Sequence, residues 1–328
     1  MVTVIIPTYK RAKYIERAIE SVLNQTYKDY EIIVVDDNDE NSEDRKNMEK
    51  IMQKYQKLDN FIYAKHKKNM NGAAARNTGI KLAKGEYITF LDDDDFFLKN
   101  RLEILVKEME ENIEYDAIYS SCVFIKGKEI IGYIEAEKNG NLEEEILMQK
   151  SFFGTGSNMF FRKEAMNEVG EFDKSFIRHQ DFEYMVRFFE KNKKILAVNK
   201  VLVIKSNDDI INRPNLEKAI QLREKYLKRF AKNIEKYDKN TIFAKNYTDL
   251  LIIAIQNFDI SNYKKIKKDI QKYTTITLKQ KIYFSLILLN SFKIIQILRK
   301  PLKIINKRKL LKKVENEVIE EIKFIREK

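Results

Sequence analysis

The 328-residue chain is long enough for one large domain or two modest ones, and its 44% hydrophobic and 34% charged residues are typical of a folded protein. One cysteine, Cys122, cannot form an internal disulfide, and with only two histidines it cannot build a zinc cluster. Any bound metal must be held by carboxylates, which favours a hard cation such as Mg²⁺ or Mn²⁺.

The charge is unevenly distributed, and this predicts two domains. Residues 211–328 contain 29 Lys and Arg against 12 Asp and Glu, whereas residues 1–210 contain 33 against 38. All nine glycines lie at or before Gly170. We therefore expect a turn-rich, slightly acidic domain over residues 1–210 and a basic helical region over residues 211–328.

Apolar β-branched runs alternate with segments of helical periodicity through the first domain. The patterns predict strands at 2–6, 31–37, 61–64 and 86–95, and helices at 13–24, 42–56, within 71–85 and at 101–111. This alternation is typical of an α/β fold with a mostly parallel, doubly wound sheet flanked by helices, in which ligands bind at the carboxyl ends of the strands. The loops after Ile6, Val35 and Leu91 should therefore converge on one crevice.

The second half of the chain becomes progressively helical. Apolar runs at 117–125 and 130–134 precede a predicted helix at 180–191 and a strand at 195–203. From residue 215 onward the periodicity predicts only helices, at 216–237, 241–259, 262–273, 278–299 and after Pro301.

Five segments of the first domain stand out for their polar and charged residues. They are IIPTYKR at 5–11, EIIVVDD at 31–37, NGAAARNTGI at 71–80, FLDDDD at 90–95, and GEFD followed by RHQDFEYMVRF at 178–188. In this order and spacing they resemble the family 2 glycosyltransferases, which have the Rossmann-like GT-A fold, over about residues 1–205. The resemblance implies a nucleotide-sugar donor, a divalent metal (Mn²⁺ or Mg²⁺) and transfer to an acceptor hydroxyl.

The acidic run would serve the metal and the donor. Carboxylates at a strand end can hold a divalent cation that neutralises a leaving diphosphate. The resemblance makes Asp94 the metal ligand, with Asp92 or Asp93 contacting the ribose or a metal-bound water. Four consecutive acids leave the register open by one residue, and a solvated turn is the alternative.

The resemblance also assigns the nucleotide pocket. Asp37 would accept the N3–H of uracil, and Pro7, Thr8 and Tyr9 would line the pocket, although Asn38-Asp39 replaces the Gly-Ser that commonly follows the acids. Arg76 would be the cation near the nucleotide, with Asn77 opening a helix. An ordinary helix N-terminus is the alternative for these two.

The catalytic base would be Asp181, placed to take the proton of the acceptor hydroxyl. Gln180 stands where many relatives carry Glu, while Arg187 matches their Arg six residues after the Asp. Asp181 could instead cap a helix. The candidate acceptor-side contacts, with turn, cap or structural roles as the alternative, are Ser157, Asn158, Asp173, His179 and Arg187.

The C-terminal region has a strongly basic stretch, with eight Lys or Arg and no acid at 299–313. Lysines among Ile and Leu suit a helix lying on an anionic membrane. A solvated bundle face or a homo-oligomer interface is the alternative, and no nucleic-acid module pattern appears. The apolar stretch at 282–298 is short for a bilayer span and contains Asn290 and Lys293. Without a targeting segment at its start, the chain is expected in the cytoplasm, with contact to the inner face of the plasma membrane.

The resemblance thus implies an inverting, metal-dependent transferase using a UDP-sugar, with a glycan or lipid-linked acceptor in capsule, lipopolysaccharide or related surface-glycan synthesis. A nucleotidyltransferase would show a Gly-rich phosphate loop, which IIPTYKRAK lacks. A non-catalytic nucleotide-binding module would need no base, and loss of donor hydrolysis in Asp181→Ala would argue against it.

Overall fold

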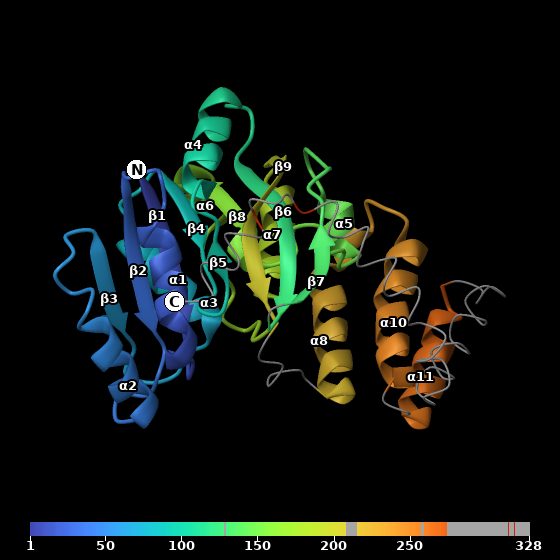
Figure 1. The fold of residues 1–328 in the computed structure, drawn as a ribbon. Coiled ribbons are helices and arrows are strands. Elements are labelled where there is room, and N and C mark those ends of the chain that lie inside the picture. The colour runs from blue at the N-terminus through green and yellow to red at the C-terminus, as the bar shows by residue number, and fades with distance from the viewer. Residues whose placement is uncertain (128, 208–214, 257–258, 274–313, 315–317, 319–328) are drawn as a thin grey trace. The chain divides into compact units, whose positions relative to one another are not determined.

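The computed structural model describes residues 1–127, 129–207, 215–256 and 259–273, together with Val314 and Val318 (Figure 1). It divides into two compact units. The first contains residues 1–142, 151–209 and 312–328, and the second contains residues 143–150 and 210–311. The helix predicted at 278–299 and the basic stretch at 299–313 lie outside the described residues.

The predicted alternation of strands and helices is confirmed in the first unit. Its elements are β1 (Val2–Thr8), α1 (Ala12–Leu23), β2 (Tyr30–Asp36), α2 (Glu43–Met52), β3 (Phe61–Lys65), α3 (Gly72–Leu82), β4 (Tyr87–Phe90) and α4 (Arg101–Glu111). Strands β3, β2, β1 and β4 lie in that order and pair in parallel (Figure 1). Parallel order places the carboxyl ends of these strands at one edge, as the sequence predicted.

The two faces of this sheet are covered by different helices because side chains alternate along a strand. Val2, Val4 and Ile6 of β1 pack in a core cluster with α1, α2 and α4. On the opposite face, α3 lies so close to β1 that a Cβ on Gly79 would come within 2.3 Å of the Ile5 side chain. The glycine therefore sets how closely α3, which carries Arg76, approaches the sheet.

The remaining strands complete a mixed sheet. They are β5 (Phe96–Phe97), β6 (Ala117–Lys126), β7 (Glu129–Ile134), β8 (Met159–Arg162) and β9 (Ile195–Ser206), joined by the 3₁₀ turn η1 (Gly156–Asn158) and by α6 (Lys163–Val169) and α7 (Gln180–Glu190). Within the described part of the chain, β6 and β9 run with the first four strands, whereas β5, β7 and β8 run against their partners. The predicted α/β class with a mostly parallel sheet is confirmed.

The second unit is helical in its described part, as expected for the C-terminal region. It contains α5 (Glu143–Leu147), α8 (Leu216–Arg229), α9 (Ala231–Ile234), α10 (Lys239–Gln256) and α11 (Ile260–Ile270). The segment predicted as one helix over 216–237 is interrupted at Phe230. Asn233 donates to Glu143 (2.6 Å), and Asn246 donates to the carbonyl of Leu147 (2.9 Å), so short α5 is fixed to these later helices.

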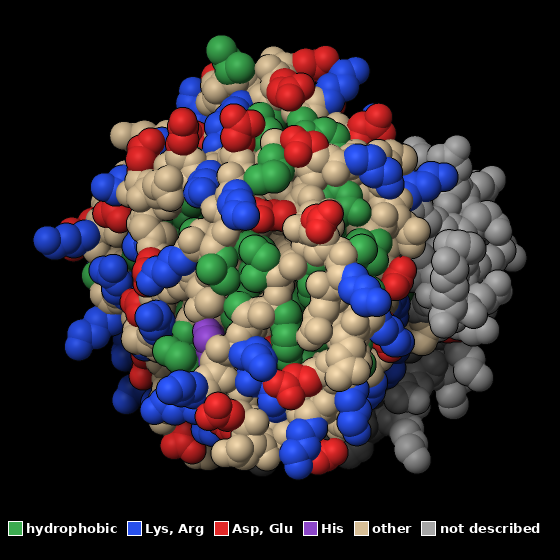
Figure 2. All heavy atoms as spheres, turned by 90° about the vertical axis from the view of Figure 1, so that its left-hand side faces the viewer, with side chains coloured by type: hydrophobic (Ala, Val, Ile, Leu, Met, Phe, Trp, Pro, Cys, Tyr) green, Lys and Arg blue, Asp and Glu red, His purple; other side chains and the backbone are tan. Residues whose placement is uncertain are grey.

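The surface of the first unit is mixed in charge. On the face drawn in Figure 2, basic and acidic side chains are interspersed around areas of hydrophobic side chains. None of the helices described is both long and apolar enough to span a bilayer.

Candidate functional site: a nucleotide-sugar crevice

Asp36 and Asp37, at the end of β2, have different environments. Asp36 is fully buried and paired with Arg45 Nε (2.8 Å), and it accepts hydrogen bonds from the Tyr63 hydroxyl (2.5 Å) and the Asn38 amide (2.9 Å). It therefore supports the loop rather than facing a ligand.

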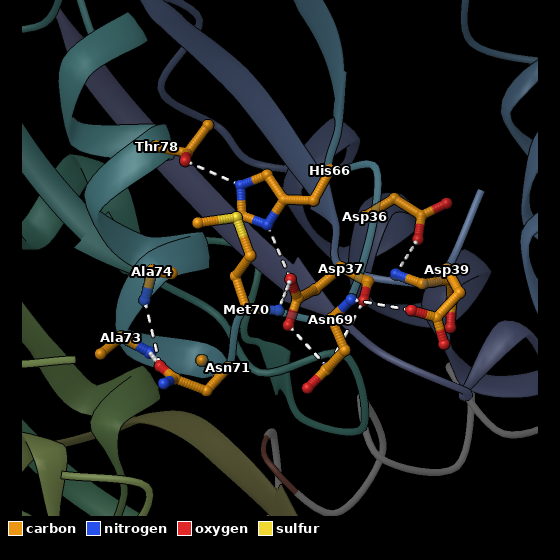
Figure 3. Close-up of polar contacts among 12 residues, drawn as sticks. Asp36, Asp37, Asp39, His66, Asn69, Met70, Asn71, Ala73, Ala74 and Thr78 are labelled. Carbon is orange, nitrogen blue, oxygen red and sulfur yellow. Dashed lines mark hydrogen bonds and ion pairs between the residues drawn. The ribbon is translucent and has the colours of Figure 1, made fainter. Parts of the chain in front are cut away.

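Asp37 is held by groups from the segment between β3 and α3 (Figure 3). Its Oδ1 accepts from the Met70 amide (2.8 Å) and contacts His66 Nδ1 (2.6 Å), and its Oδ2 accepts from Asn69 Nδ2 (2.8 Å). Burial raises the pKa of the Asp37 carboxyl, and the hydrogen bonds from His66 and the Met70 amide oppose that rise.

Thr8, at the end of β1, and Tyr9, just after it, lie next to the backbone of Asp37 and Asn38. The Asp37 amide donates to the carbonyl of Thr8 (2.9 Å), and the Lys10 amide donates to Asn38 Oδ1 (2.9 Å). Tyr9 keeps 37% of its surface exposed next to this junction, whereas Thr8 is buried. Asn38, at the position where the Gly-Ser pattern is lost, thus fixes the turn through its side chain.

The four consecutive acids at 92–95 form a tight turn after β4, closed by the Asp95 amide donating to the Asp92 carbonyl (3.0 Å). Alternate side chains point in different directions. Asp95 points inward, accepting from Thr155 (2.9 Å), Ser157 (2.6 Å) and the amide of Ser206 (3.1 Å). Asp93 is also buried and accepts from the Thr8 hydroxyl (2.7 Å).

Asp92 and Asp94 are the more exposed pair, at 30% and 15% of their side-chain surface. Asp92 pairs with Arg76 Nη2 (2.8 Å), and Asp94 pairs with Arg11 Nη1 (2.5 Å). Burial raises the pKa of Asp93 and Asp95 to about 7, and the neighbouring carboxylate of Asp94 adds to the rise. A bound cation would stabilise the ionised form of these poorly solvated, mutually repelling carboxylates.

The carboxylates fit a divalent metal that binds together with a diphosphate. The described residues contain no ready-made cluster of three or more Asp, Glu, His or Cys ligands. Mg²⁺ and similar ions are commonly held by one or two carboxylates plus substrate phosphates. Asp94, with Asp92 beside it, offers the hard oxygen donors that such an arrangement needs.

Asp181 and Arg76 line the same pocket. The pocket is small and otherwise mainly apolar, with walls that include Phe90, Gly156, Phe172 and Tyr184. Arg76 Nη1 donates to Gln180 Oε1 (2.9 Å), so one guanidinium joins Asp92 to the residue before Asp181. Asp181 lies in the first turn of α7, while His179, with φ 56°, occupies the N-cap position without a side-chain cap. Asp181 is therefore not the N-cap, although its Oδ1 accepts from the Phe182 amide within the same first turn (3.1 Å).

Several predicted acceptor-side residues serve as supports. Ser157 and Asn158 are fully buried, and Asn158 donates to the carbonyls of Ser120 (2.5 Å) and Phe153 (2.8 Å). Arg187 binds both carboxylate oxygens of Glu183 (2.7 and 2.8 Å), and Asp173 Oδ1 accepts from the Ser175 amide (2.8 Å). We assign these residues to shaping the site.

The expectation that Asn77 opens a helix is wrong. Helix α3 begins at Gly72, and its N-cap is Asn71, with φ 76° and a side-chain oxygen that accepts from the Ala73 and Ala74 amides (2.9 and 3.3 Å; Figure 3). Asn77 lies inside the helix and makes a two-way hydrogen bond with the backbone of Phe172 (2.8 and 2.9 Å). It joins α3 to the loop before α7.

Sequence reasoning missed three residues of this site: His66, Arg11 and Lys205. Lys205 lies on β9 near the acidic turn. Burial lowers the pKa of its ammonium, but the carboxylates of Asp95, Asp92 and Asp181 outweigh burial and raise it. His66 and Lys205 follow or end strands, so the strand-end rule could have identified both.

Comparisons with known proteins agree with this geometry. The family model for Glycosyl transferase family 2 matches residues 3–170. Poly(ribitol-phosphate) β-N-acetylglucosaminyltransferase TarP of Staphylococcus aureus is 30% identical over 308 residues, covering 84% of this chain and 91% of TarP. The chain therefore belongs to glycosyltransferase family 2, and the predicted enzyme class is confirmed.

Solved structures show the same fold. S. aureus TarS 1–349 in complex with UDP-GlcNAc superposes with a TM-score of 0.57 at 17% identity, covering 99% of this chain and 90% of that one. The mannosyltransferase PcManGT of Pyrobaculum calidifontis, in complex with GDP-Man and Mn²⁺, gives 0.56 at 15% identity, covering 99% and 85%. The expected GT-A fold is confirmed.

Proposed function

We propose that the chain transfers a sugar from a UDP-sugar to a hydroxyl of a glycan or lipid-linked acceptor in surface-polysaccharide synthesis, by a single inverting displacement. The observation that carries this proposal is that Asp181 and Arg76 line one pocket, while Arg76 also binds Asp92 of the acidic turn. Arg76 thus connects the proposed base with the proposed donor-binding carboxylates, which supports a single site for both.

In the proposed reaction, the acceptor oxygen attacks the anomeric carbon and its proton passes to the Asp181 carboxylate. The bond from the anomeric carbon to the diphosphate oxygen breaks, and UDP leaves with the electron pair. A divalent ion held at Asp94 would neutralise the diphosphate as it leaves. Arg76 and Lys205 add positive charge on the protein side.

A uracil base is favoured by the donors around Asp37. A carboxylate has about four acceptor positions, and His66, Asn69 and the Met70 amide occupy three. The amide of Asn71 also faces the carboxylate and lowers its pKa, so a base N–H would compete with that amide for the fourth position. Uracil offers one N–H at its edge. Guanine offers two adjacent donors, and cytosine N3 has no hydrogen.

For the acceptor, support comes from relatives and from charge. TarP acts, by its name, on poly(ribitol-phosphate). The described helix α11 carries Lys264, Lys265, Lys267 and Lys268. We infer that the basic helical region binds an anionic acceptor or the anionic inner face of the plasma membrane. Co-sedimentation with anionic but not with zwitterionic vesicles would support membrane binding, and equal recovery with both would contradict it.

The first test measures thermal stability with UDP, GDP, CDP, ADP and dTDP, each with and without Mn²⁺. A ligand that binds only the folded state raises the melting temperature by mass action. A UDP shift that requires Mn²⁺ and disappears in Asp94→Ala is expected. No shift with any nucleotide would overturn the proposed function.

The second test separates binding from chemistry. Asp181→Asn should keep the UDP-induced shift and lose both transfer and donor hydrolysis, falling by at least about 100-fold because general-base catalysis contributes roughly 10²–10⁴. Asp59→Asn, at an exposed carboxyl in the loop before β3, is the matched control and should behave as wild type. Full activity in Asp181→Asn would refute its assignment as the base.

A further inference from the structure

His66 bridges two elements at the nucleotide crevice. It follows β3 directly, and its backbone amide donates to the Asp36 carbonyl (2.9 Å), which fixes its place beside the end of β2. Its Nδ1 contacts Asp37 Oδ1 (2.6 Å), and its Nε2 contacts Thr78 Oγ1 on α3 (2.8 Å; Figure 3). The side chain is largely buried, with 9% of its surface exposed.

The partners fix the orientation of the ring. An ionised carboxylate only accepts hydrogen bonds, so Nδ1 carries a proton and donates to Asp37. Nε2 then accepts from the Thr78 hydroxyl when the imidazole is neutral. This tautomer is assigned from donor chemistry. The result is a chain of hydrogen bonds from α3, through His66, to one oxygen of Asp37.

Two consequences follow for Asp37. Its side chain is 3% exposed, and Oδ1 is filled by His66 and the Met70 amide. A ligand N–H would therefore reach the carboxylate at Oδ2, beside Asn69, in competition with the Asn71 amide. Its plane is also fixed, because donors from separate residues hold both oxygens. Removing His66 would free a position on Oδ1 and allow the carboxylate to rotate.

We propose that His66 is a positioning residue for base recognition: held by Thr78, it leaves Asp37 with a single, oriented acceptor that selects a base with one ring N–H. This inference rests on the proposed function, since it concerns the nucleotide that the same site binds. His66 does not itself touch the base; it acts through Asp37.

Near-isosteric substitutions separate the two contacts of the ring. In His66→Asn the side-chain amide nitrogen lies near the place of Nδ1 and can still donate to Asp37, but it does not reach Thr78. In His66→Gln the amide lies near the place of Nε2 and cannot keep the Asp37 contact without moving. Thr78→Val removes the hydroxyl from the relay, and Thr78→Ser keeps it as the matched control.

The measurement is the affinity for UDP, CDP, GDP and dTDP with Mn²⁺, by titration calorimetry on the full chain. His66→Gln and His66→Ala should weaken UDP binding by about tenfold or more, with a smaller change for CDP, because a charge-assisted contact that orients Asp37 is lost. His66→Asn should retain most of the preference for UDP over CDP. Thr78→Val should reduce the preference for UDP over CDP, and Thr78→Ser should keep it.

A double-mutant cycle tests the route through Asp37. If His66 acts only through that carboxylate, His66→Ala should have little further effect on UDP affinity in an Asp37→Ala background, which leaves no side-chain acceptor for the ring. Additive effects would overturn the inference. So would an unchanged ratio of UDP to CDP affinity in His66→Gln at unchanged melting temperature.

The outcomes distinguish this inference from the proposed function. If the wild type binds UDP with Mn²⁺ and the His66 variants show the same preference for UDP over CDP, only the role of His66 is refuted. Wild type that prefers GDP refutes the single-acceptor argument while leaving a nucleotide-sugar transferase. Wild type that binds no nucleotide refutes both.

Discussion

Replacing Asp37 by Asn tests the assignment of the nucleotide site most directly. In Asp37→Asn the remaining side-chain oxygen would take the place of Oδ1, because His66 and the Met70 amide both donate there. The new NH₂ group would then face the ligand where the carboxylate had accepted a hydrogen bond. Uracil N3–H meets a donor in that position, whereas cytosine N3 meets a partner.

The expected magnitude follows from the contact that is lost. A hydrogen bond to a charged group contributes about 1.5–3 kcal/mol, so UDP affinity should fall by roughly 10- to 150-fold. CDP affinity should fall much less or rise, since both nucleotides share the diphosphate and the metal. The ratio of the two dissociation constants therefore isolates the base.

The assay is calorimetric titration of UDP and CDP with Mn²⁺, with Asp36→Asn as the matched control. Asp36 is the neighbouring acid but binds only protein groups, so its variant should lose stability without changing the UDP-to-CDP ratio. Equal losses for UDP and CDP in Asp37→Asn, or a loss below about threefold, would refute the assignment of Asp37 to the base.

Three further predictions concern the rest of the crevice. Lys205→Met should weaken UDP binding roughly tenfold but leave uridine binding unchanged, because two unit charges about 12 Å apart interact by about 1.4 kcal/mol at an effective dielectric of about 20 and only UDP carries the diphosphate charge. Equal effects on both ligands in calorimetry would contradict this. The pKa of Asp93 and Asp95, raised by burial to about 7, lies above the unfolded value of about 3.9, so the folded state binds more protons between those pH values. The free energy of unfolding should therefore fall as pH rises from about 4 to 7. Urea titrations at several pH values should show a smaller fall in Asp95→Asn than in wild type, and an equal fall would exclude Asp95 as a cause. Gly79→Ala should destabilise the chain by about 1–3 kcal/mol through overpacking against Ile5, and a neutral result in urea titration would mean that α3 can move away from β1.

Sequence patterns predicted the parallel part of the sheet because each of its strands is a continuous apolar run followed by polar residues. EIIVVDD forms β2 up to Asp36, and the helix predicted at 101–111 is α4 with those bounds. The antiparallel insertion of β8 between β4 and β6 could not be predicted, since pairing order depends on long-range contacts that leave no local pattern.

Within the site, the kinds of residue present could be predicted better than the directions in which their side chains point. The acidic run marked the crevice, but which acids face solvent depends on the turn at 92–95, and no spacing rule distinguishes four identical side chains. Ser157 and Asn158 were expected at the acceptor because they are polar residues in a stretch that resembles the family's acceptor-side segment. The 3₁₀ turn that contains them directs both inward, beneath that acidic turn.

Arg11 gives the crevice a resident counter-ion. Its guanidinium contacts Asp93 (3.3 Å) and Asp94 (2.5 Å), and although burial alone would lower its pKa, these carboxylates raise it. A free divalent ion must compete with this internal cation for Asp94, whereas a diphosphate offers Arg11 another anionic partner. Metal and nucleotide should therefore bind with positive heterotropic cooperativity: Mn²⁺ alone binds weakly, and each ligand lowers the dissociation constant of the other by the same factor.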